Sequence, residues 1–147
     1  MSNGDKKQDS KSPNQKAVDD FGAMLMKQVR DNQIELWDQT LSGKIKYKNY
    51  QQVHEKLAQT LDPAQLALVQ RLTVWVIDDV IAHFLAMLEE NDEIDVTVHL
   101  DGKTVPSLRD ATDGLEAALY GEDGWIIRFS KMKPTDVAYF TEDVPLD

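Results

Sequence analysis

Asp79 and His83 are the residues whose types and spacing come closest to a catalytic or metal-binding pair. They lie four positions apart in a segment with helical periodicity, so both side chains project from one helical face. A carboxylate and an imidazole in this arrangement can hold a divalent metal, or form a general base with its orienting partner, and Asp78 lies one position away. The same spacing is also typical of a surface pair that stabilises a helix by roughly 0.2–0.5 kcal/mol.

The sequence does not contain the two histidines with an intervening glutamate that mark a helical zinc site. We therefore favour the surface pair. The alternative is a metal-dependent or acid/base enzyme in which Asp79 and His83 are catalytic and Asp78 completes the metal site. The absence of cysteine excludes thiol catalysis, disulfides and iron–sulfur or zinc-thiolate sites. Phosphate-binding glycine loops and the nucleophile-elbow pattern are also missing, so the sequence predicts no cofactor.

Many of the remaining carboxylates fall in two groups in the second half of the chain, at residues 89–95 and 110–123. Their spacing does not match a helix-loop-helix calcium site. Those of the first group lie near the predicted C-terminus of a helix, where negative charge opposes the helix dipole, and this unfavourable placement favours a use in binding. The predicted partner-binding residues are Trp75 and the following acids: Glu89, Glu90, Asp92, Glu93, Asp110, Asp113, Glu122 and Asp123.

The net charge of −10 is distributed unevenly along the chain. Residues 1–60 carry ten Lys and Arg and eight Asp and Glu, a net charge of +2, whereas residues 61–147 carry six and eighteen, a net charge of −12. Such a field repels nucleic acid and anionic membranes and attracts basic proteins, although simple solubility is an alternative explanation. The cluster of three lysines within residues 44–48 is too small to predict a nucleic-acid site.

Trp75 shares a face of its predicted helix with Ala82 and Ala86, and a large ring beside two small residues forms a shallow groove. We expect this groove to pack against the first helix of the same chain, because a long helix at the centre of a domain needs neighbours on more than one side. The alternatives are a docking surface in which Trp75 anchors a partner, and a contact between the subunits of a homodimer.

Apolar periodicity predicts three helices in the first ninety residues. The first spans about residues 15–41 and places Val18, Phe21, Leu25, Val29 and Leu36 on one face. A second helix is expected over about residues 49–61. The third begins at Asp62-Pro63, a helix cap followed by a proline in the first turn, and ends near Glu90. This third helix is the predicted central core helix, with a broad apolar arc formed by Val74, Val76, Ile77, Val80, Ile81, Phe84, Leu85, Met87 and Leu88.

The pattern changes from helical to alternating after residue 92. Ile94–Leu100 predicts a half-buried strand, Asp101-Gly102 a two-residue turn, and residues 103–105 the returning strand. Ser107 or Thr112 is expected to cap a short helix that ends before Gly121. The apolar run Gly124–Ser130 predicts a third strand, and residues 137–140 predict a fourth.

Helices first, followed by strands with one inserted helix, indicate an α+β fold: N-terminal helices with a long central core helix, then a small antiparallel sheet of three or four strands. We expect a flexible arm over residues 1–14, one domain over 15–140 and an acidic tail over 141–147. Neither a secretion signal nor a membrane-spanning segment is predicted, so we expect a cytoplasmic protein. The favoured function is that of a small acidic non-enzymatic binding domain, an inhibitor, immunity-type or antitoxin-like factor that engages a basic protein. The alternatives are the enzyme above and a structural homo-oligomer subunit.

Overall fold

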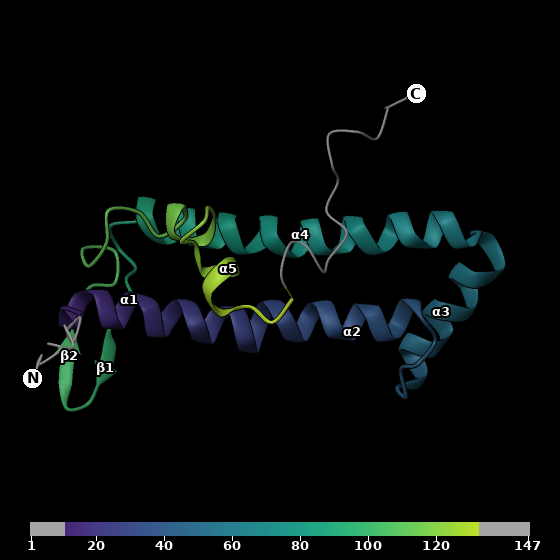
Figure 1. Cartoon of the computed structure of the whole chain (residues 1–147), viewed down its shortest axis with the longest axis horizontal. Helices are drawn as coiled ribbons and strands as arrows, with labels where there is room; N and C mark the ends of the chain where they lie inside the picture. Colours follow the sequence, from purple (N-terminus) through teal and green to yellow (C-terminus); the bar gives the residue numbers. More distant parts are fainter. Residues whose placement is uncertain (1–10, 133–147) are drawn as a thin grey trace, which may run out of the picture.

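Two long helical segments lie antiparallel, side by side, in the computed structural model, which describes residues 11–132 (Figure 1). The first segment is continuous through α1 (Pro13–Met24), the π-helical turn η1 (Leu25–Arg30) and α2 (Asp31–Leu41). The second is α4 (Pro63–Glu90). These helices confirm the predicted first and third helices, and the fold is mostly helical with a small antiparallel sheet.

Side-chain caps explain where both long segments begin. The Ser12 hydroxyl accepts the backbone N–H of Gln15, and Pro13 occupies the first turn, where a missing N–H costs nothing. At the start of α4, Asp62 accepts the N–H of Gln65 at 2.9 Å, and the Gln65 side chain accepts the N–H of Asp62 at 2.9 Å. This reciprocal capping box confirms the helix start predicted at Asp62-Pro63.

The π-helical turn changes which residues of the first helix face the core. In η1 the backbone N–H of Asp31 bonds to the carbonyl of Met26, five residues back, so one extra residue fits into the turn. Positions after it are therefore rotated relative to an uninterrupted α-helix. As a result Val29, predicted on the buried stripe, is 42% exposed, whereas Arg30 is fully buried and Ile34 is 1% exposed.

A short third helix closes one end of the helical pair. α3 (Lys48–Thr60) confirms the helix predicted there and follows a connection in which Ile45 is buried between exposed lysines. Trp37 of α2 meets Tyr50 of α3 in an edge-on contact with ring centroids 5.9 Å apart. This contact holds α3 beside the end of α2 (Figure 1).

The opposite end carries a two-stranded hairpin. β1 (Val98–Leu100) pairs antiparallel with β2 (Lys103–Val105), and the turn between them has positive φ at both Asp101 (50°) and Gly102 (75°). The predicted turn is therefore confirmed, and its geometry matches the strand twist of a two-residue hairpin. The predicted sheet of three or four strands is wrong for residues 11–132, which form a two-stranded sheet. The predicted fourth strand, at residues 137–140, lies outside the described residues.

The segment predicted as the third strand is a short helix, α5 (Trp125–Phe129). A short apolar run does not distinguish a buried strand from a buried helical turn, and here packing decides. The indole of Trp125 lies so close to Gly22 of α1 that a Cβ at Gly22 would overlap it, and Arg128 reaches Asp19. Helical geometry lets both contacts reach the first helix from consecutive turns.

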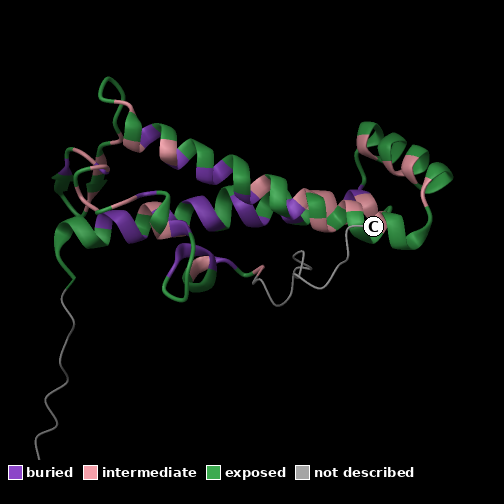
Figure 2. Ribbon diagram, turned by 90° about the horizontal axis from the view of Figure 1, so that it is seen from above, coloured by how far each residue is buried: buried purple, intermediate pink, exposed green. Residues whose placement is uncertain are grey.

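The helix predicted between the hairpin and α5 is reduced to turns. Ser107 accepts the N–H of Asp110 at 3.0 Å, and regular structure is limited to the 3₁₀ turn η2 (Ala117–Leu119). This segment and α5 lie against one side of the helical pair and bury its core (Figures 1 and 2). The main core consists of Val18, Leu25, Met26, Ile81, Ala82, Leu85, Leu88, Leu108, Leu115, Leu119, Trp125 and Ile126.

α4 is a core helix on one face only. Val74, Ile81, Leu85 and Leu88 are buried, but Val76, Val80, Phe84 and Met87 of the predicted apolar arc are 41–63% exposed. The broad arc was thus an overestimate of the buried surface, because the described chain packs along a single side of this helix. Within residues 11–132 no helix combines the length and hydropathy needed to cross a bilayer.

Candidate protein-binding surface

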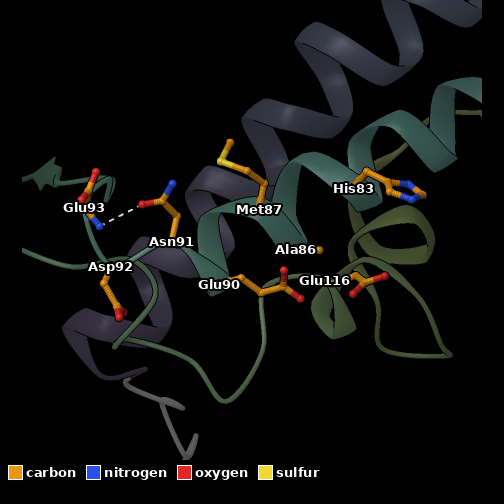
Figure 3. A pocket seen from close by; sticks show the side chains of 8 residues that line it. All are labelled: His83, Ala86, Met87, Glu90, Asn91, Asp92, Glu93 and Glu116. Atoms are coloured by element: carbon orange, nitrogen blue, oxygen red, sulfur yellow. Dashed lines mark hydrogen bonds between the residues drawn. The ribbon is translucent and has the colours of Figure 1, made fainter.

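An acidic hollow of about 700 Å³ lies at the C-terminal end of α4 (Figure 3). The last turns of α4, the connection that follows it and the turn before η2 form its walls. Each of these three segments contributes at least one carboxylate to the lining of the hollow, which also includes Met87. The lining residues are His83, Ala86, Met87, Glu90, Asn91, Asp92, Glu93 and Glu116.

Asn91 shapes the connection that carries two of these acids. α4 ends at Glu90, and the Asn91 side chain then accepts the backbone N–H groups of Glu93 at 2.8 Å and Ile94 at 3.2 Å (Figure 3). An asparagine that bonds to the backbone two residues on imposes a tight turn. This turn keeps Asp92 and Glu93 beside the helix end.

Glu89 fixes the opposite wall of the hollow. Its carboxylate accepts the N–H groups of Leu115 at 2.7 Å and Glu116 at 3.1 Å, so the loop is attached to the last turn of α4. Leu115 is buried beneath this contact, and Glu116 is left exposed at the rim. Glu89, predicted as a partner-binding residue, therefore has both carboxylate oxygens engaged in holding the loop.

The hollow is strongly negative because few cations reach it. Arg109 lies 3.5 Å from Asp92, 4.0 Å from Asp95 and 3.9 Å from Asp110, and its guanidinium also donates to the carbonyl of Asn91. Among the described residues, no Lys, Arg or His lies within ion-pair distance of Glu90, Glu93 or Glu116. Within residues 11–132, these three exposed carboxylates thus have no cation at ion-pair distance.

His83 and Asp79 form the exposed helical pair that the sequence favours. Nδ1 of His83 lies 2.8 Å from the carbonyl oxygen of Asp79 and 3.5 Å from its carboxylate, and both side chains are well exposed. The hydrogen bond to that carbonyl, the charge of Asp79 and the more distant charge of Glu116 together raise the pKa of His83. When it is protonated, His83 therefore places a positive charge at one edge of the hollow.

Asp78 does not join Asp79 and His83, as the metal or catalytic hypothesis requires. Its carboxylate is buried on another face of α4 and binds Arg30. Residues 11–132 contain no group of three or more His, Asp or Glu side chains arranged to hold a metal ion. The geometry therefore leaves Asp79 and His83 as a two-residue pair.

The remaining predicted partner-binding residues are exposed but lie outside the hollow. Asp110 and Asp113 are in the turns after the hairpin, and Glu122 and Asp123 immediately precede α5. Trp75 is 56% exposed, so the expectation that the first helix covers its face is wrong. The predicted groove beside it does not form as a unit, because Ala82 is buried in the core and Ala86 lines the hollow.

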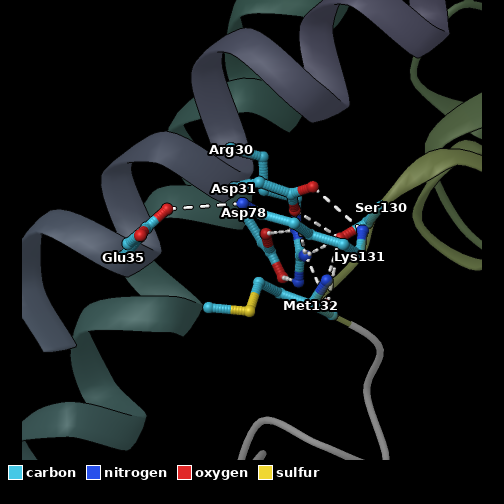
Figure 4. Close-up of polar contacts among 7 residues, drawn as sticks. All are labelled: Arg30, Asp31, Glu35, Asp78, Ser130, Lys131 and Met132. Atoms are coloured by element: carbon cyan, nitrogen blue, oxygen red, sulfur yellow. Dashed lines mark hydrogen bonds and ion pairs between the residues drawn. The ribbon is translucent and has the colours of Figure 1, made fainter.

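A buried polar network connects α1–α2, α4 and the end of α5 (Figure 4). Arg30 binds the Asp78 carboxylate with bonds of 2.6 and 3.1 Å and donates to the Ser130 hydroxyl at 2.8 Å and the Met132 carbonyl at 2.7 Å. Ser130 in turn donates to Asp31. The sequence pattern did not predict this network, although Arg30-Asp31 in an amphipathic helix and Asp78 next to an apolar arc are signals that point to it.

No family model matches the chain, and no curated protein or solved structure is significantly similar to it.

Proposed function

We propose that the chain is a non-enzymatic binding domain whose acidic hollow receives a basic segment of a partner protein. The observation that carries this proposal is that Glu90, Glu93 and Glu116 line an opening of about 700 Å³ without a neutralising cation at ion-pair distance among the described residues. Like charges that line one opening repel one another, and this repulsion costs free energy in the unbound protein. A cationic ligand removes that repulsion, so binding and charge neutralisation are coupled.

The chemistry of the opening selects a ligand that carries both charge and an apolar stem. An arginine guanidinium can bond to a carboxylate with two parallel hydrogen bonds, and its methylene groups, like those of lysine, pack on apolar surface. Met87, which is 41% exposed, supplies a flexible thioether for that stem. We therefore expect a partner segment with an Arg or Lys next to an apolar residue.

The surrounding charge favours fast and salt-sensitive association. Residues 74–132 carry four Lys and Arg and thirteen Asp and Glu, a net charge of −9. A field of this sign steers basic partners and weakens as salt shortens the Debye length to about 8 Å at physiological ionic strength. An inhibitor, immunity-type or antitoxin-like role is the class of function that uses such a surface, since masking a basic site on another protein requires no chemistry.

The test compares two double variants with the same net charge. Glu90→Gln/Glu93→Gln removes two charges from the hollow, and Glu55→Gln/Glu122→Gln removes two exposed charges elsewhere. The probe is a fluorescent peptide that contains alternating arginine and leucine, followed by anisotropy at low salt. We expect the hollow variant to weaken binding about 10-fold or more and the control variant to change it less than about 3-fold, because only the former removes direct contacts.

Two results would contradict the proposal. Equal weakening by both variants would mean that the peptide senses net charge alone. Binding that is unaffected by the hollow variant would place the contact elsewhere. The same pair of variants can then be used to capture proteins from the source cell, where the relevant partner is one retained by the wild type and the control but lost with the hollow variant.

A further inference from the structure

α4 carries a row of exposed apolar side chains that the acidic hollow does not use. Leu68, Leu72, Val76, Val80 and Phe84 follow one another at four-residue steps, and we call them the α4 ridge. They are 47%, 47%, 52%, 63% and 43% exposed, respectively. Isolated exposed apolar residues are ordinary, but five consecutive members of one helical row form a continuous apolar surface.

The ridge lies outside the packed face of the same helix. Val74, Ile81 and Leu85 are buried on the inner face of α4, and α5 and the loop before it cover one side of the core (Figure 2). The ridge spans 17 residues, which corresponds to about 24 Å of helix at 1.5 Å per residue. Its length and regularity match the surface that one helix presents to another.

Rows at four-residue steps are the ridges that pack into the grooves of a second helix in the commonest class of helix packing. In that class the two helices cross at about −50°. The ridge is symmetric about Val76, because Leu72 and Val80 lie four residues to either side and Leu68 and Phe84 eight residues to either side. A symmetric row can pair with itself when two helices meet in opposite directions.

Charge along the molecule favours this opposite orientation. Residues 39–73, at the end that contains α3, carry five Lys and Arg and two Asp and Glu, a net charge of +3. Residues 74–132, which include the other end of α4 and the hollow, carry the net charge of −9 given above. A parallel pair would place like charges together, whereas an antiparallel pair places the basic end of one copy near the acidic end of the other.

Few charged side chains lie near the α4 ridge, so there is little charge repulsion between two copies at this surface. Between residues 63 and 77, Arg71 is the one charged side chain in the sequence, so the first half of the ridge is free of carboxylates. Beyond it, Asp78 is buried against Arg30, and Asp79 is the nearest exposed acid; an antiparallel copy centred on Val76 would place residue 73, a threonine, opposite Asp79. Most carboxylates of the two copies therefore lie away from the apolar contact.

We propose that a second copy of this chain occupies the α4 ridge in an antiparallel arrangement, with Val76 at the two-fold axis and Leu72 facing Val80 of the other copy. The contact is isologous, as expected of a two-fold dimer. It leaves the acidic hollow open, because the hollow lies at the end of α4 and the crossing point lies near its middle. Dimer formation and capture of a basic partner are thus separate properties.

The first test measures mass in solution by light scattering and sedimentation over a range of concentrations. The wild type is expected at twice the 16.7 kDa of the chain. Val76→Glu places two carboxylates together at the axis and is expected to weaken the dimer about 100-fold or more. Val53→Glu makes the same substitution at an exposed position of α3 and should leave the mass unchanged. A monomeric wild type at high concentration, or a dimer unaffected by Val76→Glu, would overturn the proposal.

The second test determines direction, and the absence of cysteine from the sequence makes it simple. Leu72→Cys and Val80→Cys proteins are mixed and treated with a short bis-maleimide. Positions near the crossing point are chosen because ridges that cross at an angle diverge toward their ends. Antiparallel pairing predicts linked species of mixed composition, with little linkage within either protein alone. Efficient linkage of each protein to itself would overturn the antiparallel arrangement. Because Glu90 and Glu93 are unchanged in these variants, failure here leaves the proposed binding function intact.

Discussion

The carboxylates in the buried network around Arg30 and those in the acidic hollow have different environments. In the network, Asp78 receives two bonds from Arg30, and Asp31 receives bonds from Ser130 and the backbone of Lys131. In the hollow, Glu90, Glu93 and Glu116 have no cation within reach among the described residues. Spacing along the helix does not distinguish these environments. Asp78 and Asp79 are neighbours, yet the side chain of Asp78 is 2% exposed and that of Asp79 is 65% exposed. The segments that pack against each residue determine whether its carboxylate is buried and paired or exposed.

The largest effect is expected from breaking the buried pair. Asp78→Asn removes the nearer of the two buried carboxylates that compensate the buried Arg30 guanidinium and leaves Asp31 at 3.7 Å, so the free energy of unfolding should fall by about 3 kcal/mol. Asp79→Asn, at the adjacent exposed position, should change it by less than about 0.5 kcal/mol. Urea unfolding measures both values. Similar values for the two variants would mean that the buried pair does not hold the three segments together.

Asp19 is an intermediate case, and its pH dependence sharpens the comparison. Hydrogen bonds from Arg128, with help from Lys11, hold the pKa of Asp19 at about 2, below its ordinary value of 3.8. Because the folded-state pKa is the lower one, this carboxylate stabilises the fold above pH 4 and loses that contribution as the pH falls toward 2. Its side chain is 8% exposed but its partners are partly solvated, so we expect a contribution on the order of 1–2 kcal/mol.

The measurement is the difference in unfolding free energy between the wild type and Asp19→Asn as a function of pH. This difference should be largest above about pH 4.5 and should shrink progressively toward pH 2. A difference that is constant with pH would show that the carboxylate charge contributes nothing beyond its hydrogen bonds.

The smallest effect is expected at the edge of the hollow. The carbonyl and carboxylate of Asp79 raise the pKa of His83 above 6.5, with a lesser contribution from Glu116. Glu116→Gln should therefore lower that pKa slightly, and Asp79→Asn should lower it more. Proton NMR titration of the imidazole resolves shifts of this size. A pKa of His83 below 6.5 in the wild type would contradict the exposed, acidic surroundings described here.

Local signals predicted the helical half of the fold well. The Asp62-Pro63 start and the Asp101-Gly102 turn were identifiable because capping and positive-φ turns depend on a few consecutive residues. The helix over Trp125–Phe129 was mistaken for a strand because its conformation depends on Gly22 and Asp19, more than one hundred positions away. A local sequence pattern does not reveal contacts between residues so far apart in the chain.

The candidate surface was predicted only in part for the same reason. Glu90, Asp92 and Glu93 were identified by their position after a helix, and all three line the hollow. Glu116 was not among the predicted partner-binding residues, because the bonds that position its loop are donated to Glu89 by backbone N–H groups 26 and 27 residues away. Asp78 was grouped with Asp79 because helical spacing alone does not reveal that Arg30 lies against one of them and not the other.

The π-helical turn makes the first helix sensitive to its length. It places Leu25 and Met26 on the inward side together with Arg30 and Asp31, which an ordinary helix would turn in a different direction. Because the Asp31 N–H bonds to the Met26 carbonyl across one extra residue, deleting a residue within Leu25–Arg30 would leave Asp31 over Met26 in regular α-helical bonding, whereas deleting a residue on either side of this turn would rotate the two halves of the helix by about 100° relative to each other. We therefore expect this helix to tolerate changes of residue type on its outer side better than changes of residue number. The number of residues on each side of the turn, rather than their types, keeps the two halves of the helix aligned.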